Sequence, residues 1–133
     1  MQNKPDITIS YEDVLEIEKQ LENIDLPVEV YDALEDELAR ANVVEAKDLP
    51  KNVISIGSQV TFKIVKNDQC FTKTLCLPFD MDKYPDSISV FAPIGSALLG
   101  LKSGQKISWM TQNGKQEISI LNVKQKVNYF FCT

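Results

Sequence analysis

The stretch that decides the fold is residues 88–105, ISVFAPIGSALLGLKSGQ, in which a strand pattern, a proline turn and a helical pattern follow one another. Ile88–Phe91 has the β-branched and aromatic residues typical of a strand. Pro93 ends that strand because proline donates no hydrogen bond to a ladder. Ser96–Leu101 then predicts one short helix, which ends at the turn signal Ser103-Gly104. A lone helix between strands indicates a sheet with one covered face.

Strand patterns flank this stretch on both sides. Upstream, apolar and polar residues alternate along Val60–Val65, and a polar turn leads to a second alternating run, Cys70–Leu77. Downstream, Lys106–Met110 and Glu117–Val123 are joined through Asn113-Gly114, whose residues favour the positive φ angles of a tight hairpin turn. These patterns predict four or five antiparallel strands with one helix, which is a small α+β domain.

The first 48 residues predict a helical hairpin in place of more sheet. Ser10 followed by Asp13 has the spacing of a capping box. Two sets of apolar residues then recur at spacings of three, four and three, namely Val14, Ile17, Leu21, Ile24 and Tyr31, Leu34, Leu38, Ala41. Between them, Asp25 is predicted to cap a second helix and Pro27 to lie in its first turn. The two seams predict a short antiparallel coiled coil with arms of roughly 22 Å.

Charge divides the chain at the same place. The net charge is −5, but residues 1–50 hold 14 acidic against 4 basic residues, and residues 51–133 hold 5 acidic against 10 basic residues. An acidic N-terminal unit disfavours direct binding of that unit to a nucleic acid, since phosphates repel it. We therefore predict two units, 1–48 and 49–133. The lysines of the second unit could contact nucleic acid, but a charge of +5 spread over 83 residues is more typical of a solvated surface.

Composition narrows the class of protein further. Hydrophobic residues make up 44% of the 133 residues and charged residues 25%, as in ordinary globular domains. No histidine is present, so the commonest general base and metal ligand is missing, and the three cysteines lack zinc-site spacing. No membrane span or signal peptide is recognisable. We expect a cytoplasmic protein with no metal or cofactor, in which any catalysis would need residues other than histidine.

The quoted stretch resembles the signature of the GreA/GreB transcript-cleavage factors, in which a strand, a Ser-Pro or Ala-Pro turn, an ALLG helix and a glycine turn follow each other. Ala92-Pro93, the ALLGL run at 97–101 and the later Trp109 are similar to the Rnk branch, named for regulation of nucleoside diphosphate kinase. Leu26-Pro27 at the hairpin tip and the run LPKNV at 49–53 fit the same branch.

The resemblance implies an FKBP-like C-terminal domain that docks on the rim of the secondary channel of bacterial RNA polymerase. The short hairpin would point into the channel and compete there without cleaving RNA. The resemblance thus implies a monomer that has no enzymatic activity of its own and meets nucleic acid only through the polymerase. By position, the docking residues would be Phe91, Ala92, Pro93, Ile94 and Gly95. We expect substitutions of Phe91 or Pro93 to weaken binding and to leave stability nearly unchanged, as surface changes do.

Transcript cleavage and peptidyl-prolyl isomerisation are two alternatives to polymerase binding alone. The predicted hairpin tip comprises Glu22, Asp25, Leu26, Pro27 and Glu29. Its carboxylates are the ligand type that Mg²⁺ requires for transcript cleavage, yet helix capping and the helix dipole explain the same acids. A peptidyl-prolyl isomerase on an FKBP-like fold is the other alternative, but fold alone does not confer activity.

Overall fold

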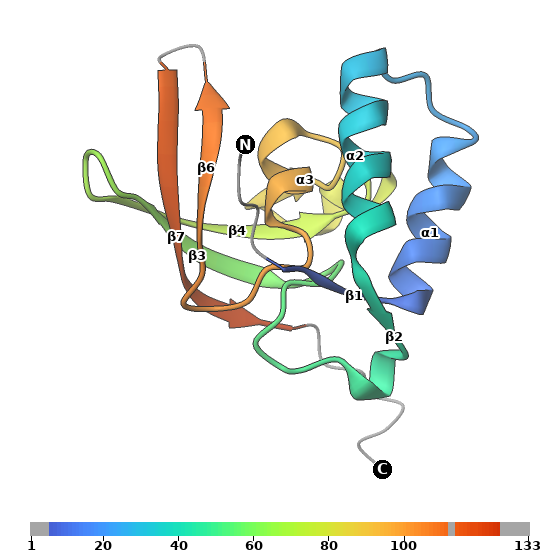
Figure 1. The fold of residues 1–133 in the computed structure, drawn as a ribbon, viewed down its shortest axis with the longest axis horizontal. Helices are drawn as coiled ribbons and strands as arrows, with labels where there is room; N and C mark the ends of the chain where they lie inside the picture. The colour runs from blue at the N-terminus through green and yellow to red at the C-terminus, as the bar shows by residue number, and fades with distance from the viewer. Residues whose placement is uncertain (1–5, 112–113, 126–133) are drawn as a thin grey trace.

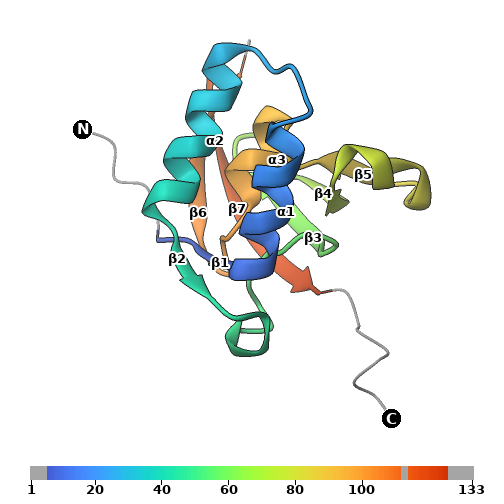
Figure 2. The same cartoon turned by 90° about the vertical axis from the view of Figure 1, so that its right-hand side faces the viewer.

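The computed structural model describes residues 6–111 and 114–125, which form a sheet with helices gathered on one side of it (Figures 1 and 2). The five-stranded sheet has the order β5-β4-β3-β7-β6. Its strands are β3 Gln59–Ile64, β4 Gln69–Cys76, β5 Ser87–Ser89, β6 Lys106–Thr111 and β7 Gly114–Lys124. The helices are α1 Tyr11–Leu21, α2 Val28–Arg40 and α3 Pro93–Leu98, with the 3₁₀ turns η1 Ala46–Asp48 and η2 Pro78–Lys83. The predicted α+β class is confirmed.

The sheet is antiparallel at three of its four strand pairs. β3 pairs with β4, and β6 pairs with β7, as the hairpin signals predict. β3 also pairs with β7, which is distant from it in the sequence and which no hairpin signal predicts. The predicted turn residue Asn113 lies outside the described residues. The prediction of an entirely antiparallel sheet is wrong at β5, which runs parallel to β4 with Cys76 opposite Ser89. The segment containing η2 carries the chain back along the sheet edge, so both strands run in the same direction.

A second, two-stranded sheet, which the sequence analysis does not predict, joins the two ends of the helical hairpin. β1 (Thr8–Ser10) and β2 (Asn42–Val44) run parallel to each other. The Thr8 amide donates to the Gly100 carbonyl at 3.0 Å, which ties β1 to the chain just after α3. A Cβ atom on Gly100 would lie 2.8 Å from the Cβ of Ile7, and its φ of +84° also favours glycine. This glycine lets the hairpin base approach the sheet domain closely.

The helix boundaries agree with the capping signals at α1 and differ at the other helices. The Ser10 hydroxyl accepts from the Asp13 amide at 3.1 Å, which confirms the predicted N-cap. Pro27 occupies the N-cap of α2, so the prediction that Asp25 caps this helix is wrong. Asp25 lies too early to reach the free amides of a helix that begins at Val28. Glu29 lies in the first turn of α2, as predicted.

The short helix α3 begins and ends three residues before the predicted Ser96–Leu101. Pro93 lies in its first turn, where the fixed φ of proline suits a helix and its missing amide hydrogen is not needed. Gly100 has a positive φ, so the chain leaves the helical conformation before Leu101. The proline that was interpreted as a strand end therefore also begins the helix.

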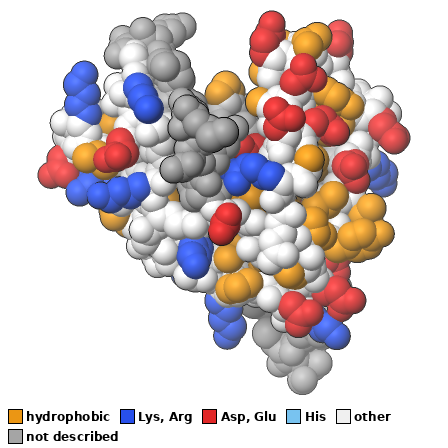
Figure 3. Space-filling model, in the orientation of Figure 1, with side chains coloured by type: hydrophobic (Ala, Val, Ile, Leu, Met, Phe, Trp, Pro, Cys, Tyr) orange, Lys and Arg blue, Asp and Glu red, His pale blue; other side chains and the backbone are white. Residues whose placement is uncertain are grey.

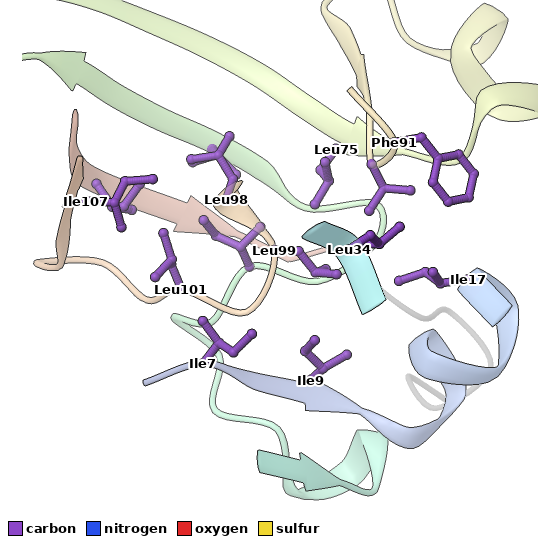
Figure 4. Close-up of a cluster of buried hydrophobic side chains, with 14 of the residues drawn as sticks. Ile7, Ile9, Ile17, Leu34, Leu75, Phe91, Leu98, Leu99, Leu101 and Ile107 are labelled. Atoms are coloured by element: carbon purple, nitrogen blue, oxygen red, sulfur yellow. The ribbon is translucent and has the colours of Figure 1, made fainter. Parts of the chain in front are cut away.

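One hydrophobic core joins the hairpin to the sheet domain. Ile17 of α1 and Leu34 of α2 are fully buried, and they belong to the same cluster as Leu75, Leu98 and Ile118 (Figure 4). The resemblance implies a hairpin that projects towards a partner, whereas most of this hairpin packs against the sheet domain. Helices of 11 and 13 residues are too short to be stable alone, so they bury their apolar seams against the sheet domain. The tip end of α2 and the loop that joins it to α1 extend beyond α3 in Figures 1 and 2.

Candidate docking loop and acidic hairpin

The predicted docking loop, Phe91–Gly95, comprises the end of the turn that follows β5 and the first three residues of α3. The Ser89 hydroxyl accepts from the Phe91 amide at 3.0 Å, and the Ser89 carbonyl accepts from the Ala92 amide at 3.0 Å. Pro93 follows at the start of α3 with an exposed side chain. Two hydrogen bonds to Ser89 restrain the turn, and such restraint reduces the entropy lost when a loop binds a partner.

The side chain of Phe91 points away from solvent. It is 6% exposed, and Figure 4 shows its ring in the same cluster as Ile17 and Leu34 of the hairpin. The expectation that Phe91 is a surface residue, whose replacement leaves stability nearly unchanged, is therefore wrong. The Phe91 ring therefore belongs to the core that the docking loop, the sheet and the hairpin share.

The rest of the loop divides into exposed and structural positions. Gly95 is buried, and a Cβ atom there would lie 1.9 Å from the Ser89 carbonyl oxygen. Glycine at this position thus permits α3 to lie against β5. Ala92 and Ile94 are half-buried, and Pro93 is the one exposed residue among the five. The accessible part of the loop is therefore centred on Pro93.

The hairpin tip presents its acids to solvent. Glu22, Asp25 and Glu29 are all exposed, whereas Leu26 is half-buried and packs against the core cluster; Pro27 is exposed. Glu22 also forms the C-cap of α1. Within residues 6–111 and 114–125, no three carboxylate, thiol or imidazole side chains gather into a group that could hold a metal ion.

The outer surface of the hairpin is strongly acidic. Residues 11–41 hold 11 Asp or Glu against one lysine and one arginine. Figure 3 shows these carboxylates gathered over the helices, on the opposite side of the view from most of the exposed lysines of the sheet domain. A single-sign surface of this kind attracts basic partners and repels nucleic acid phosphates.

Two acids of the hairpin accept hydrogen bonds from backbone amides of a distant segment. The Asp13 carboxylate accepts from the Ile56 amide at 3.0 Å, and the Glu12 carboxylate accepts from the Ala46 amide at 3.1 Å. Both bonds fix the base of α1 to the segment between β2 and β3. No local pattern in the sequence indicates this connection, because the two partners are backbone amides far away in the sequence.

Burial raises the pKa of the Asp13 carboxyl above its usual value, although the hydrogen bonds from Ile56 and Ser10 lower it in part. Since the folded state disfavours the charged form, Asp13 opposes folding at neutral pH, and this effect is relieved as the pH falls through the raised pKa. We expect Asp13→Asn, which keeps an acceptor for the Ile56 amide, to be more stable than the wild type at neutral pH. This advantage should shrink towards pH 4 in urea unfolding experiments.

Asp13→Ala is the matched control, because it removes the acceptor as well as the charge. It should lower the free energy of unfolding by about 1–3 kcal/mol, since the Ile56 amide loses its partner. Equal stability of the Ala and Asn variants would contradict the proposed role of this hydrogen bond.

One exposed aromatic residue that the sequence analysis does not single out lies in η2, the turn that contacts β5. Phe79, in η2, is 61% exposed. A signal was present in the sequence, because this phenylalanine lies within a loop that is otherwise rich in proline and aspartate, residues 78–86. Exposed aromatic residues are enriched in protein contact surfaces.

The fold, the proline turn and the acidic hairpin are accompanied by a match to a known family. Residues 49–125 match the family described as transcription elongation factor GreA/GreB, C-terminal, so the chain belongs to this family. Among solved structures it is similar to a prokaryotic transcription elongation factor GreA/GreB from Nitrosomonas europaea, with 39% identity and a TM-score of 0.73. That match covers 91% of this chain and 99% of the other.

Curated relatives include both branches of the family. The regulator of nucleoside diphosphate kinase from Escherichia coli K12 is 35% identical over 85 residues, which are 64% of this chain and 62% of that protein. Transcription elongation factor GreA from Helicobacter hepaticus is 36% identical, over 67% of this chain and 55% of that protein. The matches thus span about three fifths of these relatives' lengths. Gfh1 from Thermus aquaticus, at 22% identity and a TM-score of 0.50, shares the fold.

Within the described residues, none of the helices combines the length and the apolar character that a bilayer crossing requires.

Proposed function

We propose that this protein is an RNA polymerase-binding transcription regulator of the Rnk type. Its docking loop, centred on Pro93, binds the rim of the secondary channel, and its short acidic hairpin faces the channel entrance without stimulating RNA cleavage. The observation that carries the proposal is the exposed proline on a rigid turn in a GreA/GreB-family domain. The protein acts as a monomer in the cytoplasm, where its partner works.

The short reach of the hairpin supports competition for the channel in preference to cleavage. At 1.5 Å per residue, helices of 11 and 13 residues are about 16 and 20 Å long. They are also held against the sheet domain through Ile17 and Leu34, so they extend little beyond it. The acidic surface then steers the protein towards basic surfaces around the channel, an effect that salt weakens.

The test of this function combines binding with a cleavage assay. Labelled protein is titrated with bacterial core RNA polymerase, and a backtracked complex is then incubated with saturating protein and Mg²⁺. We expect binding with no increase in cleavage over polymerase alone. Stimulated cleavage that is lost in a Glu22→Gln, Asp25→Asn double variant would instead establish the cleavage-factor alternative.

Pro93→Asn tests the docking loop itself. We expect the variant to bind core polymerase at least fivefold more weakly, because an exposed rigid apolar contact is replaced by a flexible amide. The free energy of unfolding should change by less than about 1 kcal/mol, since the side chain is exposed and asparagine is tolerated near a helix start. Unchanged affinity would remove Pro93 from the interface.

The name of the Escherichia coli relative extends the proposal to control of nucleoside diphosphate kinase. Adding the purified protein to the purified kinase separates a direct effect from an effect through transcription. An unchanged kinase rate would indicate the indirect route.

A further inference from the structure

We infer that Phe79 is the aromatic anchor of the polymerase-docking surface, inserting into an apolar site on the polymerase that is bordered by basic side chains. This inference rests on the proposed function and identifies a second loop for the same interface. The aromatic residue of the docking loop, Phe91, is buried in the core and unavailable to a partner. Phe79 offers the exposed ring that Phe91 does not.

The parallel pairing of β4 and β5 brings the two loops together. Cys76 lies opposite Ser89, and the Cys76 carbonyl accepts from the Val90 amide at 2.9 Å. The carboxyl ends of neighbouring parallel strands lie side by side. The chain therefore leaves β4 and β5 at points one strand spacing, ~4.8 Å, apart. Phe79 is three residues beyond Cys76, and Pro93 is four residues beyond Ser89. The two exposed apolar residues therefore leave the sheet from adjacent positions.

The segment that carries Phe79 is fixed at both ends. At its start, the Leu77 carbonyl accepts from the Asp80 amide at 2.9 Å. At its end, Asp86 accepts twice from the buried Thr74, through its carboxylate from the hydroxyl at 3.0 Å and through its carbonyl from the amide at 2.9 Å. The η2 turn also lies against β5. An exposed phenylalanine on a segment held in this way loses little entropy on binding, as expected of an interface anchor.

The charges around Phe79 indicate the chemistry of the partner surface. Residues 78–86 contain three acids and one lysine, namely Asp80, Asp82, Asp86 and Lys83. Lys83 forms an ion pair with Asp80 at 2.9 Å, and Asp82 is exposed. An apolar ring bordered by net negative charge fits an apolar site bordered by lysine or arginine, and it does not fit a nucleic acid.

The experiment measures the affinity of the full-length protein for bacterial core RNA polymerase by fluorescence anisotropy. Phe79→Ala should raise the Kd at least tenfold, and Phe79→Tyr, which keeps the ring, should stay within threefold of the wild type. Leu121→Ala, which replaces an exposed apolar residue on β7, is the matched control and should stay within twofold. Circular dichroism melts should show all three variants folded, because each replaced side chain is exposed.

A double variant tests whether Phe79 and Pro93 contact one surface. The fold-increase in Kd of the Phe79→Ala, Pro93→Asn double variant should be smaller than the product of the fold-increases of the two single variants. Such non-additivity is expected for neighbouring contacts with one partner. If the wild type binds core polymerase and the Kd of Phe79→Ala is within twofold of the wild-type Kd, this inference is overturned and the proposed function still stands. No binding of the wild type to core polymerase would overturn both.

Discussion

Phe91→Asp is expected to lower the free energy of unfolding by about 4 kcal/mol or more. Truncation of a buried phenylalanine alone costs about 3–5 kcal/mol, and here a carboxylate would also enter the apolar cluster that contains Ile17 and Leu34. Domains of this size have about 5–15 kcal/mol of stability in total. The variant should therefore be close to its unfolding threshold, which urea titration followed by circular dichroism would show.

Phe79→Asp is the matched control for this result. It makes the same chemical change at a phenylalanine that is 61% exposed instead of 6%, so it should alter the free energy of unfolding by less than about 1 kcal/mol. A Phe91→Asp protein as stable as the wild type, with reduced polymerase affinity, would restore Phe91 to the docking surface. Loss of binding by an unfolded Phe91 variant would instead say nothing about the interface.

Gly95→Ala is expected to cost at least about 3 kcal/mol, because the added Cβ would lie 1.9 Å from a carbonyl oxygen of β5. Helix propensity alone predicts the opposite sign, since alanine favours a helix over glycine by up to about 1 kcal/mol. The expected loss therefore isolates the close approach of α3 to β5. Urea unfolding measures the change in stability, and amide exchange at Ala92 and Ser96 shows whether α3 is displaced.

Gly104→Ala separates steric overlap from backbone strain. Gly104 has a φ of +92°, but no atom lies within 4 Å of the position of an added Cβ. Alanine there should cost only about 1–2 kcal/mol, from the left-handed backbone conformation. If Gly95→Ala cost no more than Gly104→Ala, the backbone of β5 would have moved aside readily, and the docking loop would be less rigid than its hydrogen bonds to Ser89 indicate.

The positions of Phe91 and Gly95 change the interpretation of the docking loop. Two of its five predicted residues, Phe91 and Gly95, hold the loop in place, and Pro93 presents the exposed surface. A binding study that replaces all five together would mix unfolding with loss of contact. Single replacements at Pro93 and Phe79 avoid that difficulty because both side chains are exposed.

In the hairpin, sequence periodicity is sufficient to identify the helices but not the surface against which they pack. The spacing of apolar residues identified both helices, and the Ser10 cap was confirmed at the level of its hydrogen bond. The same seams were interpreted as a coiled coil, since a helix that packs on another helix and one that packs on a sheet show the same period. Leu34 and Ile17 could satisfy either arrangement, and the sequence does not identify the surface that covers them.

The sequence by itself determined the helices, the five strands of the main sheet, the position of the proline turn and the separation of charge, because each depends on neighbouring residues along the chain. Only the tertiary structure decided that β1 pairs with β2, that β5 runs parallel to β4, and that Asp13 binds the Ile56 amide. It also decided which phenylalanine is buried and which is exposed. These features join residues distant in sequence, and a local pattern carries no information about its distant partner.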